Sequence, residues 1–300
     1  MRLLSFVLLI SGFLTYSCAV ITPSQVAMVN NLAVVSDSIS VAPARIFEQL
    51  AEVRKERGLY YAASISSARA RYLEIDALAE AAIADDQAVK RMNLYVDVLN
   101  SFLRSLRSIS NDIRWEGAGR EIRGVGRNID SLVIAWNKLN PGDPVETGIA
   151  KHTGKSVAYV VEELTKRRQA IIVREFVRQG DTLVSACCDM LINLLRKKEV
   201  NELILNEEAG LEANYKAYLD AMELSRTFPL IENDRRYLAL KKEIYDAKEM
   251  RNKCITSLRS LKNAHSKLLT ELQERKKINQ VYQELLELNQ QAFELMTLLK

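Results

Sequence analysis

A heptad pattern runs through LKKEIYDAKEMRNKCITSLRSLKNAHSKLL, residues Leu240 to Leu269, and continues to Met296. Stepping alternately by four and three residues from Leu240 to Met296 gives 17 positions, of which 12 are apolar. Apolar residues at this spacing line one side of an α-helix and pack against a neighbouring helix as in a coiled coil. The pattern predicts one helix over 231–299. Its apolar seam is Leu240, Ile244, Ala247, Cys254, Leu258, Leu261, Leu268, Leu272, Tyr282, Leu286, Phe293 and Met296, and its polar layers are Arg251, His265, Arg275, Asn279 and Asn289.

The rest of the chain has the same helical character, and turn signals divide it. No segment has the two-residue periodicity of a strand. Asp85-Asp86, Asn140-Pro141-Gly142 and Phe228-Pro229 are turn or cap signals, and they predict helices over 43–84, 87–139, 144–226 and 231–299. Short connections make neighbouring helices antiparallel. The predicted fold is therefore all-α: an elongated up-down-up-down bundle of about four long helices with coiled-coil-like packing.

Composition agrees with a helical rod. The chain of 300 residues is 48% hydrophobic and 27% charged, so it has ample material for a core. Its five prolines leave the long proline-free intervals that long helices require. The net charge of +4 is small for this length and does not indicate a nucleic-acid partner.

The N-terminus, MRLLSFVLLISGFLTYSCAV, has the pattern of a secretory signal peptide: one basic residue, an apolar run, and then small or polar residues. The segment LTYSC, Leu14 to Cys18, resembles the lipobox of bacterial membrane lipoproteins. Ser17 fits the pattern, and Thr15 stands where the lipobox usually has leucine. In that class the peptide is cut before the cysteine, whose thiol receives a diacylglycerol. The resemblance thus implies a lipid attachment site at Cys18, with palmitate-type acyl chains.

The lipobox resemblance also implies a domain order and a location. Residues 1–17 would be the signal peptide, 18–42 a lipid-anchored tether with a short helix to about Val35, and 43–300 the bundle. Ala19 is not an aspartate, so resemblance to enterobacterial lipoproteins favours the outer over the inner membrane. Two alternatives stay open: cleavage that leaves a soluble secreted protein beginning at Val20, or an uncleaved membrane anchor over Leu3 to Ile21.

The sequence contains no recognisable catalytic, cofactor or metal motif. GIAKHTGKS, Gly148 to Ser156, has five residues between its glycines where a P-loop has four, and no strand precedes it. The segment therefore predicts no nucleotide binding. The two histidines form no Glu-x-x-His pairs, and Cys187, Cys188 and Cys254 are read as small buried residues.

A glycine-rich stretch, WEGAGREIRGVGRNI, carries the one charged cluster that we single out. Helix packing explains its glycines, and a solvated face is the simplest reading of its charges. Its arginines are the candidate anion or partner contact: Arg114, Arg120, Arg123 and Arg127.

These observations favour a non-enzymatic, lipid-anchored cell-envelope protein. Its helical rod would engage another protein, a second copy of itself or the cell wall. The alternative is a secreted or surface membrane-active protein resembling long-bundle pore-forming toxins, with Ala170 to Leu195 as the inserting element.

Overall fold

The computed structural model describes residues 23–110, 166–274 and 279–298, with six further positions between 130 and 138. The described chain is helical and contains no strand, so the all-α prediction is confirmed. The main helices are α2 (Pro23–Ser40), α3 (Ala42–Ser64), α4 (Ala68–Ser110), α7 (Lys166–Arg196), α8 (Lys198–Leu224), α9 (Ile231–Glu274) and α10 (Asn279–Leu298).

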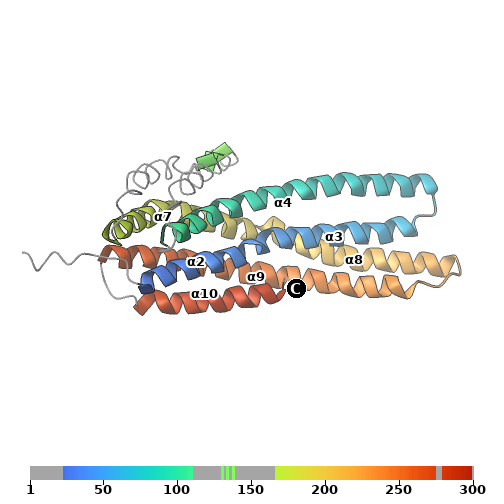
Figure 1. Ribbon diagram of the computed structural model, residues 1–300. Coiled ribbons are helices and arrows are strands. Elements are labelled where there is room, and N and C mark those ends of the chain that lie inside the picture. The colour runs from blue at the N-terminus through green and yellow to red at the C-terminus, as the bar shows by residue number, and fades with distance from the viewer. Residues whose placement is uncertain are drawn as a thin grey trace, which may run out of the picture.

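The helices lie side by side along one long axis (Figure 1). The α3–α4 turn and the α8–α9 turn lie at the same end of the bundle, which we call the distal end. Helix α2 begins at the opposite end, which we call the proximal end. In the proximal half, α2, α4, α7, α9 and α10 pack together. In the distal half, α3 contacts α4, α8 and α9.

The predicted turn at Asp85-Asp86 is wrong, and the first reversal comes earlier. Helix α3 ends at Ser64, Ile65 is extended, and α4 begins at Ala68. The hydroxyl of Ser67 accepts a hydrogen bond from the Ala70 amide, as an N-cap does. Asp85 lies inside α4, where its carboxylate pairs with Arg54 of α3 across 2.6 Å. Asp85 therefore makes an interhelical contact, and neither aspartate caps a helix.

The segment predicted as a tether contains a core helix. Helix α2 begins at Pro23 and continues past Val35, the predicted end of the short helix, through Ser40. Ser36 donates a hydrogen bond to the side-chain oxygen of Asn100 (3.1 Å), and Arg104 pairs with Asp37 (2.8 Å). Ser36 and Asp37, just beyond the predicted end of the short helix, are thus contacts to α4. Among the α2 residues whose side chains the structure describes, seven that are apolar or small are buried: Met28, Val29, Leu32, Ala33, Val35, Ser36 and Ile39.

The predicted helix over 144–226 is two helices in the part that the structure describes. The interruption lies at Lys197, between α7 and α8, whereas Gln179-Gly180-Asp181 lies inside α7. Gly180 is needed there for close packing, because a Cβ atom at this position would lie 1.9 Å from the Phe102 ring. The following reversal falls at residues 225–230, near the predicted Phe228-Pro229 turn.

The heptad prediction is confirmed along α9 and wrong beyond it. Every apolar seam position of α9 from Leu240 to Leu272 is buried. Helix α10 then packs back on α9 and on α2 rather than continuing the rod. Leu286, Phe293 and Met296 are exposed, whereas Leu288, Ala292 and Leu295 are buried. The fold-back gives α10 new neighbours and therefore a different buried face.

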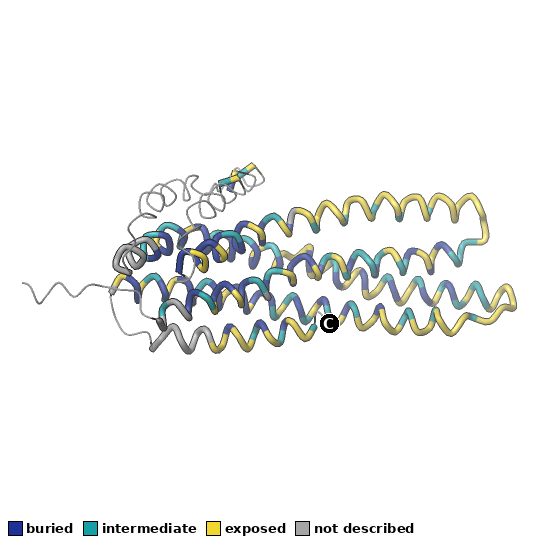
Figure 2. Tube along the Cα trace, viewed as in Figure 1, coloured by how far each residue is buried: buried dark blue, intermediate teal, exposed yellow. Residues whose placement is uncertain are grey.

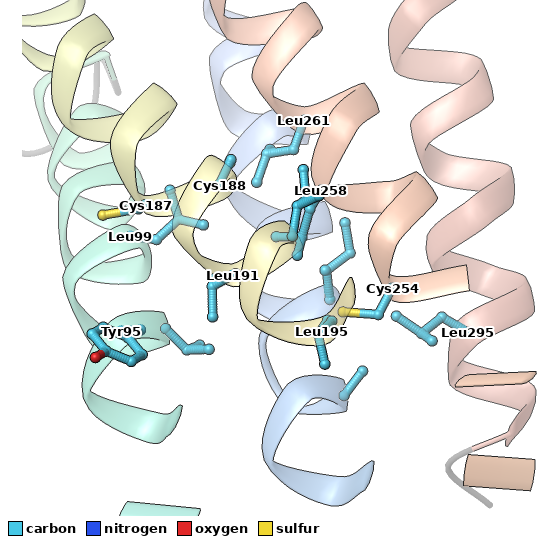
Figure 3. Packing of buried hydrophobic residues seen from close by; sticks show 14 of the residues in the cluster. Tyr95, Leu99, Cys187, Cys188, Leu191, Leu195, Cys254, Leu258, Leu261 and Leu295 are labelled. Carbon is cyan, nitrogen blue, oxygen red and sulfur yellow. The ribbon is translucent and has the colours of Figure 1, made fainter. Parts of the chain in front are cut away.

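The core is one apolar cluster that is widest in the proximal half (Figure 2). Leu191 and Leu195 of α7, Leu258 of α9 and Leu295 of α10 extend into the space between the helices (Figure 3). The three described cysteines are free and buried, as predicted. Burial raises the pKa of the Cys188 thiol to about 12 and also raises the pKa of Cys187 and Cys254.

Candidate interaction surface at the distal end

The site residues predicted from sequence lie outside the described residues. This applies to Cys18, to the P-loop-like segment 148–156, and to Arg114, Arg120, Arg123 and Arg127. His265 is described and is a buried polar layer, as predicted: its Nδ1 lies 3.0 Å from Asp181 Oδ1, and its ring meets Phe102 edge-on. Arg251, another predicted polar layer, donates to the Leu195 carbonyl at 2.6 Å.

The most exposed large apolar side chains of the described chain lie at the α8–α9 turn. Phe228 is 93% exposed and Leu224 is 87% exposed. Leu230 and Ile231, which come next along the chain at this turn, are 64% and 58% exposed. Single exposed apolar residues need no explanation, whereas several at one turn make that turn a candidate interaction site. We call Leu224, Phe228, Leu230 and Ile231 the apolar tip.

A defined backbone turn holds the apolar tip. The amide of Thr227 donates to the Met222 carbonyl, and the amide of Arg226 donates to the Glu223 carbonyl. These are the two hydrogen bonds of a Schellman motif, which requires a left-handed residue after the helix. Arg226 fills that place with φ of 54°. The turn therefore has one fixed geometry, although glycine would adopt it more readily.

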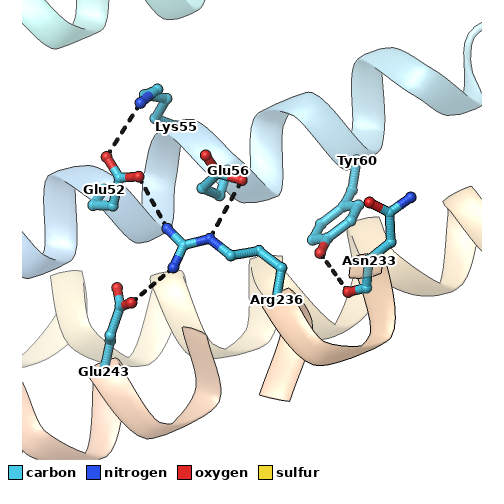
Figure 4. Close-up of polar contacts among 7 residues, drawn as sticks. All are labelled: Glu52, Lys55, Glu56, Tyr60, Asn233, Arg236 and Glu243. Carbon is cyan, nitrogen blue, oxygen red and sulfur yellow. Dashed lines mark hydrogen bonds and ion pairs between the residues drawn. The ribbon is translucent and has the colours of Figure 1, made fainter. Parts of the chain in front are cut away.

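Tyrosines connect the start of α9 to α3 and α8 just below the tip. The Tyr60 hydroxyl donates a hydrogen bond to the backbone carbonyl of Asn233 at 2.8 Å (Figure 4). The side-chain amide of Asn233 donates to the Tyr218 hydroxyl at 2.7 Å. Tyr215 bonds to the Asp234 carboxylate and stacks on Tyr237 with ring centroids 4.1 Å apart. Burial, followed by the charge of Glu56, raises the pKa of Tyr60 to about 12.

Arg236 adds a charged connection on the same side of α9. Its guanidinium contacts Glu52 at 2.9 Å and Glu56 at 3.6 Å on α3, and Glu243 at 2.9 Å on α9 (Figure 4). Burial alone would lower the pKa of Arg236, but the Glu243 charge and hydrogen bond and the two glutamates of α3 outweigh it and raise the pKa. The group stays charged and ties α9 to α3.

A buried carboxylate links α8 to α3. Glu207 is 2% exposed, and its two oxygens accept hydrogen bonds from Arg54 at 2.9 Å and Arg57 at 2.5 Å. Gly210, one turn further along α8, leaves room for the Arg57 guanidinium, because a Cβ atom there would lie 2.7 Å from it. Both oxygens of the buried charge are paired, which is the condition for such a group to be tolerated.

A groove of about 390 Å³ lies between α3 and α4. Its walls combine alanines and Leu78 with charged groups such as Glu48, Lys55 and Asp86. Within the part of the chain that the structure describes, no group of three or more His, Cys, Asp or Glu side chains could hold a metal ion. The distal half thus presents exposed apolar and charged side chains on helices that hydrogen bonds and ion pairs hold together. Such a surface is a candidate binding surface.

Comparisons with family models, with curated proteins and with solved structures found no match to this chain. The described helices form an all-α helical bundle. None of the described helices is long and apolar enough to cross a membrane.

Proposed function

We propose that this chain is a non-enzymatic, lipid-anchored protein of the bacterial cell envelope. An elongated antiparallel bundle presents its apolar tip to another envelope protein, and acylated Cys18 holds the other end at the membrane, with the outer membrane favoured. No cofactor takes part in this function. The cluster of Arg114, Arg120, Arg123 and Arg127 is a secondary candidate contact.

The apolar tip is the observation that carries this proposal. Its four large side chains are 58–93% exposed, while the residues immediately behind them are fixed by the Tyr60–Asn233 and Arg236 contacts. An ordered apolar surface loses little conformational entropy when a partner covers it. The tip therefore has the properties of a binding surface and not of a loosely packed turn.

The position of the tip in the rod supports a spacing role. Helix α2, whose first residue is Pro23, begins at the end of the bundle opposite the α8–α9 turn (Figure 1). A continuous helical path of about 40 residues spans roughly 60 Å, which is the separation that α2 and α3 provide together. A lipid at Cys18 would thus leave the tip far from the anchoring membrane.

The anchor is tested by processing of the full-length gene product. The gene is expressed in a bacterial host with labelled fatty acid, and the mature N-terminus is determined by mass spectrometry, with Cys18→Ala alongside. We expect an acylated Cys18 as the first residue and no label in the variant. A mature chain that begins at Val20 without lipid would favour the freely secreted alternative.

The tip is tested by photocrosslinking in the same cells. A photoreactive residue replaces Phe228, and a matched control replaces Lys216, an exposed polar residue of α8. We expect a discrete adduct with one envelope protein from position 228 and none from position 216. Equal adducts at both positions, or none at either, would remove the tip from the proposal.

The second candidate is a membrane-active protein, and the same apolar tip favours it, because Phe228 and Leu224 could enter a lipid surface. The element suggested from sequence, Ala170 to Leu195, carries ten buried apolar residues of the folded core between Val173 and Leu195. Insertion of that helix would require the core to open. Leakage of dye from liposomes by the purified protein, across a range of pH, would support this candidate, and intact liposomes would exclude it.

A further inference from the structure

The first half of α4 is a helix with only one covered side. Of residues 68–90, all of which the structure describes, none is buried (Figure 2). The half-buried residues Glu74, Leu78, Ala81, Asp85 and Val89 recur at helical spacing. They mark the side toward α3, where Leu78 sits against Gly58 and Asp85 pairs with Arg54. Only the second half of α4 contributes buried residues to the core.

A second seam on this helix has no partner among the described residues. Ala68, Tyr72, Ile75 and Ala79 are exposed and follow the 4-3-4 spacing of a coiled coil. Tyr72 is 66% exposed and Ile75 is 43% exposed. We call these four residues the outer seam. Its neighbour Ile83, 62% exposed, extends the apolar surface by one turn.

Two unpaired charges of opposite sign flank the outer seam. Arg69 and Asp76 lie seven residues apart, so both occupy the same edge of the seam, about 10 Å from each other along the helix. Neither forms an ion pair with any other described residue. This edge of the seam is thus basic at one end and acidic at the other. If two copies of the helix lie antiparallel, the basic end of each edge faces the acidic end of the other.

We propose that a second copy of this chain packs on the outer seam, with the two α4 helices antiparallel. One register satisfies both the apolar and the charged residues. In it Tyr72 of each copy packs on Ile75 of the other, Ala68 meets Ala79, and Arg69 faces Asp76 on both sides of the two-fold axis. A two-fold interface uses the same patch twice, as this surface requires. In the parallel direction Arg69 would face Arg69.

The alanines of the outer seam favour this arrangement further. Ala68 and Ala79 let two helix backbones approach closely at the ends of the contact, while the larger Tyr72 and Ile75 fill its centre. The dimer also covers the apolar groups that make the first half of α4 unusual within the bundle. It uses a surface different from the apolar tip and does not depend on the lipid at Cys18.

The oligomeric state of the full chain tests the proposal. The protein is solubilised in a detergent that is density-matched to the solvent and measured by sedimentation equilibrium. We expect a dimer that Tyr72→Glu with Ile75→Glu converts to a monomer. The control is Leu238→Glu, which places one glutamate at an exposed apolar position of α9, outside the outer seam. A monomeric wild type, or a dimer that survives the double change, would overturn the proposal.

Charge exchange tests the register. Arg69→Asp should weaken the dimer by about tenfold in its dissociation constant, because two ion pairs become two like-charge contacts. Arg69→Asp combined with Asp76→Arg should restore the wild-type value, since the pairs are rebuilt in reverse. Failure of this rescue would exclude the proposed register. Cys18→Ala should leave all these results unchanged, so failure of the interface and failure of the lipid anchor are separable.

Discussion

The proximal and distal halves of the bundle are stabilised in different ways. The proximal half closes around an apolar core, where Phe102 stacks on Phe176 with ring centroids 4.8 Å apart. The distal half has fewer helices at each level, and tyrosine hydrogen bonds and shared ion pairs add to its apolar contacts. The comparison teaches that the proximal half relies mainly on buried apolar side chains, whereas the distal half leaves more of its side chains exposed and adds polar contacts between its helices.

The largest effect should come from the proximal core. Phe102→Ala removes a fully buried ring that fills the space left by Gly180, so the free energy of unfolding should fall by about 3–5 kcal/mol. Phe228→Ala is the matched control at the distal tip and should change it by less than about 0.5 kcal/mol. Denaturant titration followed by circular dichroism measures both. Similar losses for the two variants would contradict the comparison.

A smaller loss should follow from the distal ion-pair network. Glu207→Gln leaves Arg54 and Arg57 without the carboxylate that both contact. Because both arginines retain some access to solvent, we expect a loss of about 2 kcal/mol in the free energy of unfolding. The exposed pair of Lys198 and Glu202 is the control, and Glu202→Gln should cost less than about 0.5 kcal/mol. An equally small effect at Glu207 would show that the network is not structural.

Alkaline pH should weaken the distal half through Tyr60. The unfolded phenol loses its proton near its ordinary pKa of 10, whereas the folded phenol keeps its proton to about 12. The folded state binds more protons between these values, so this contribution to stability is complete below pH 10 and falls as the pH rises toward 12. Tyr60→Phe should make the decline shallower in urea titrations at about pH 9 and about pH 11. An identical decline in both proteins would contradict the assigned role of Tyr60.

The smallest expected effect is a gain at the distal turn. Arg226 has φ of 54°, a conformation that glycine adopts without strain. Arg226→Gly should raise the free energy of unfolding by about 0.5 kcal/mol, part of the gain being lost to the greater freedom of glycine in the unfolded chain. A thermal melt compared with Lys216→Gly, a mid-helix control that should be destabilised by about 1 kcal/mol, gives the sign. A clear loss for Arg226→Gly would argue against the left-handed turn.

Local sequence signals predicted individual elements well where one helix has one buried side. The apolar seam of α9 from Leu240 to Leu272 is buried as its heptads predict, and a helix begins at Ile231 as expected. The turn at Ser64–Ser67 was missed because no proline or glycine marks it; Ser67 as an N-cap was the available signal. Asp85 and Asp86 were misread because a carboxylate can cap a helix or pair across two helices, and the sequence does not distinguish these roles.

The exposure of the candidate surfaces was harder to predict from the sequence. The sequence places Phe228 in a turn. Its exposure, however, depends on where the other helices lie relative to the end of α8 and the start of α9. The outer seam of α4 has the same 4-3 spacing as a buried seam, so only the arrangement of the neighbouring helices distinguishes the two. Leu286, Phe293 and Met296 illustrate the reverse case, since α10 folds back and exposes residues whose spacing predicted burial.

The sequence by itself determined the helical class, the heptad face of α9 and the burial of three free cysteines. These properties follow from residue type and spacing along one helix or one segment. Only the tertiary structure decided that α2 belongs to the core, that α10 reverses, and that Glu207 meets two arginines more than 140 residues away in the chain. The physical reason is that a side chain is covered or left exposed by helices distant in sequence, and the spacing within one helix cannot say which of its faces they will cover.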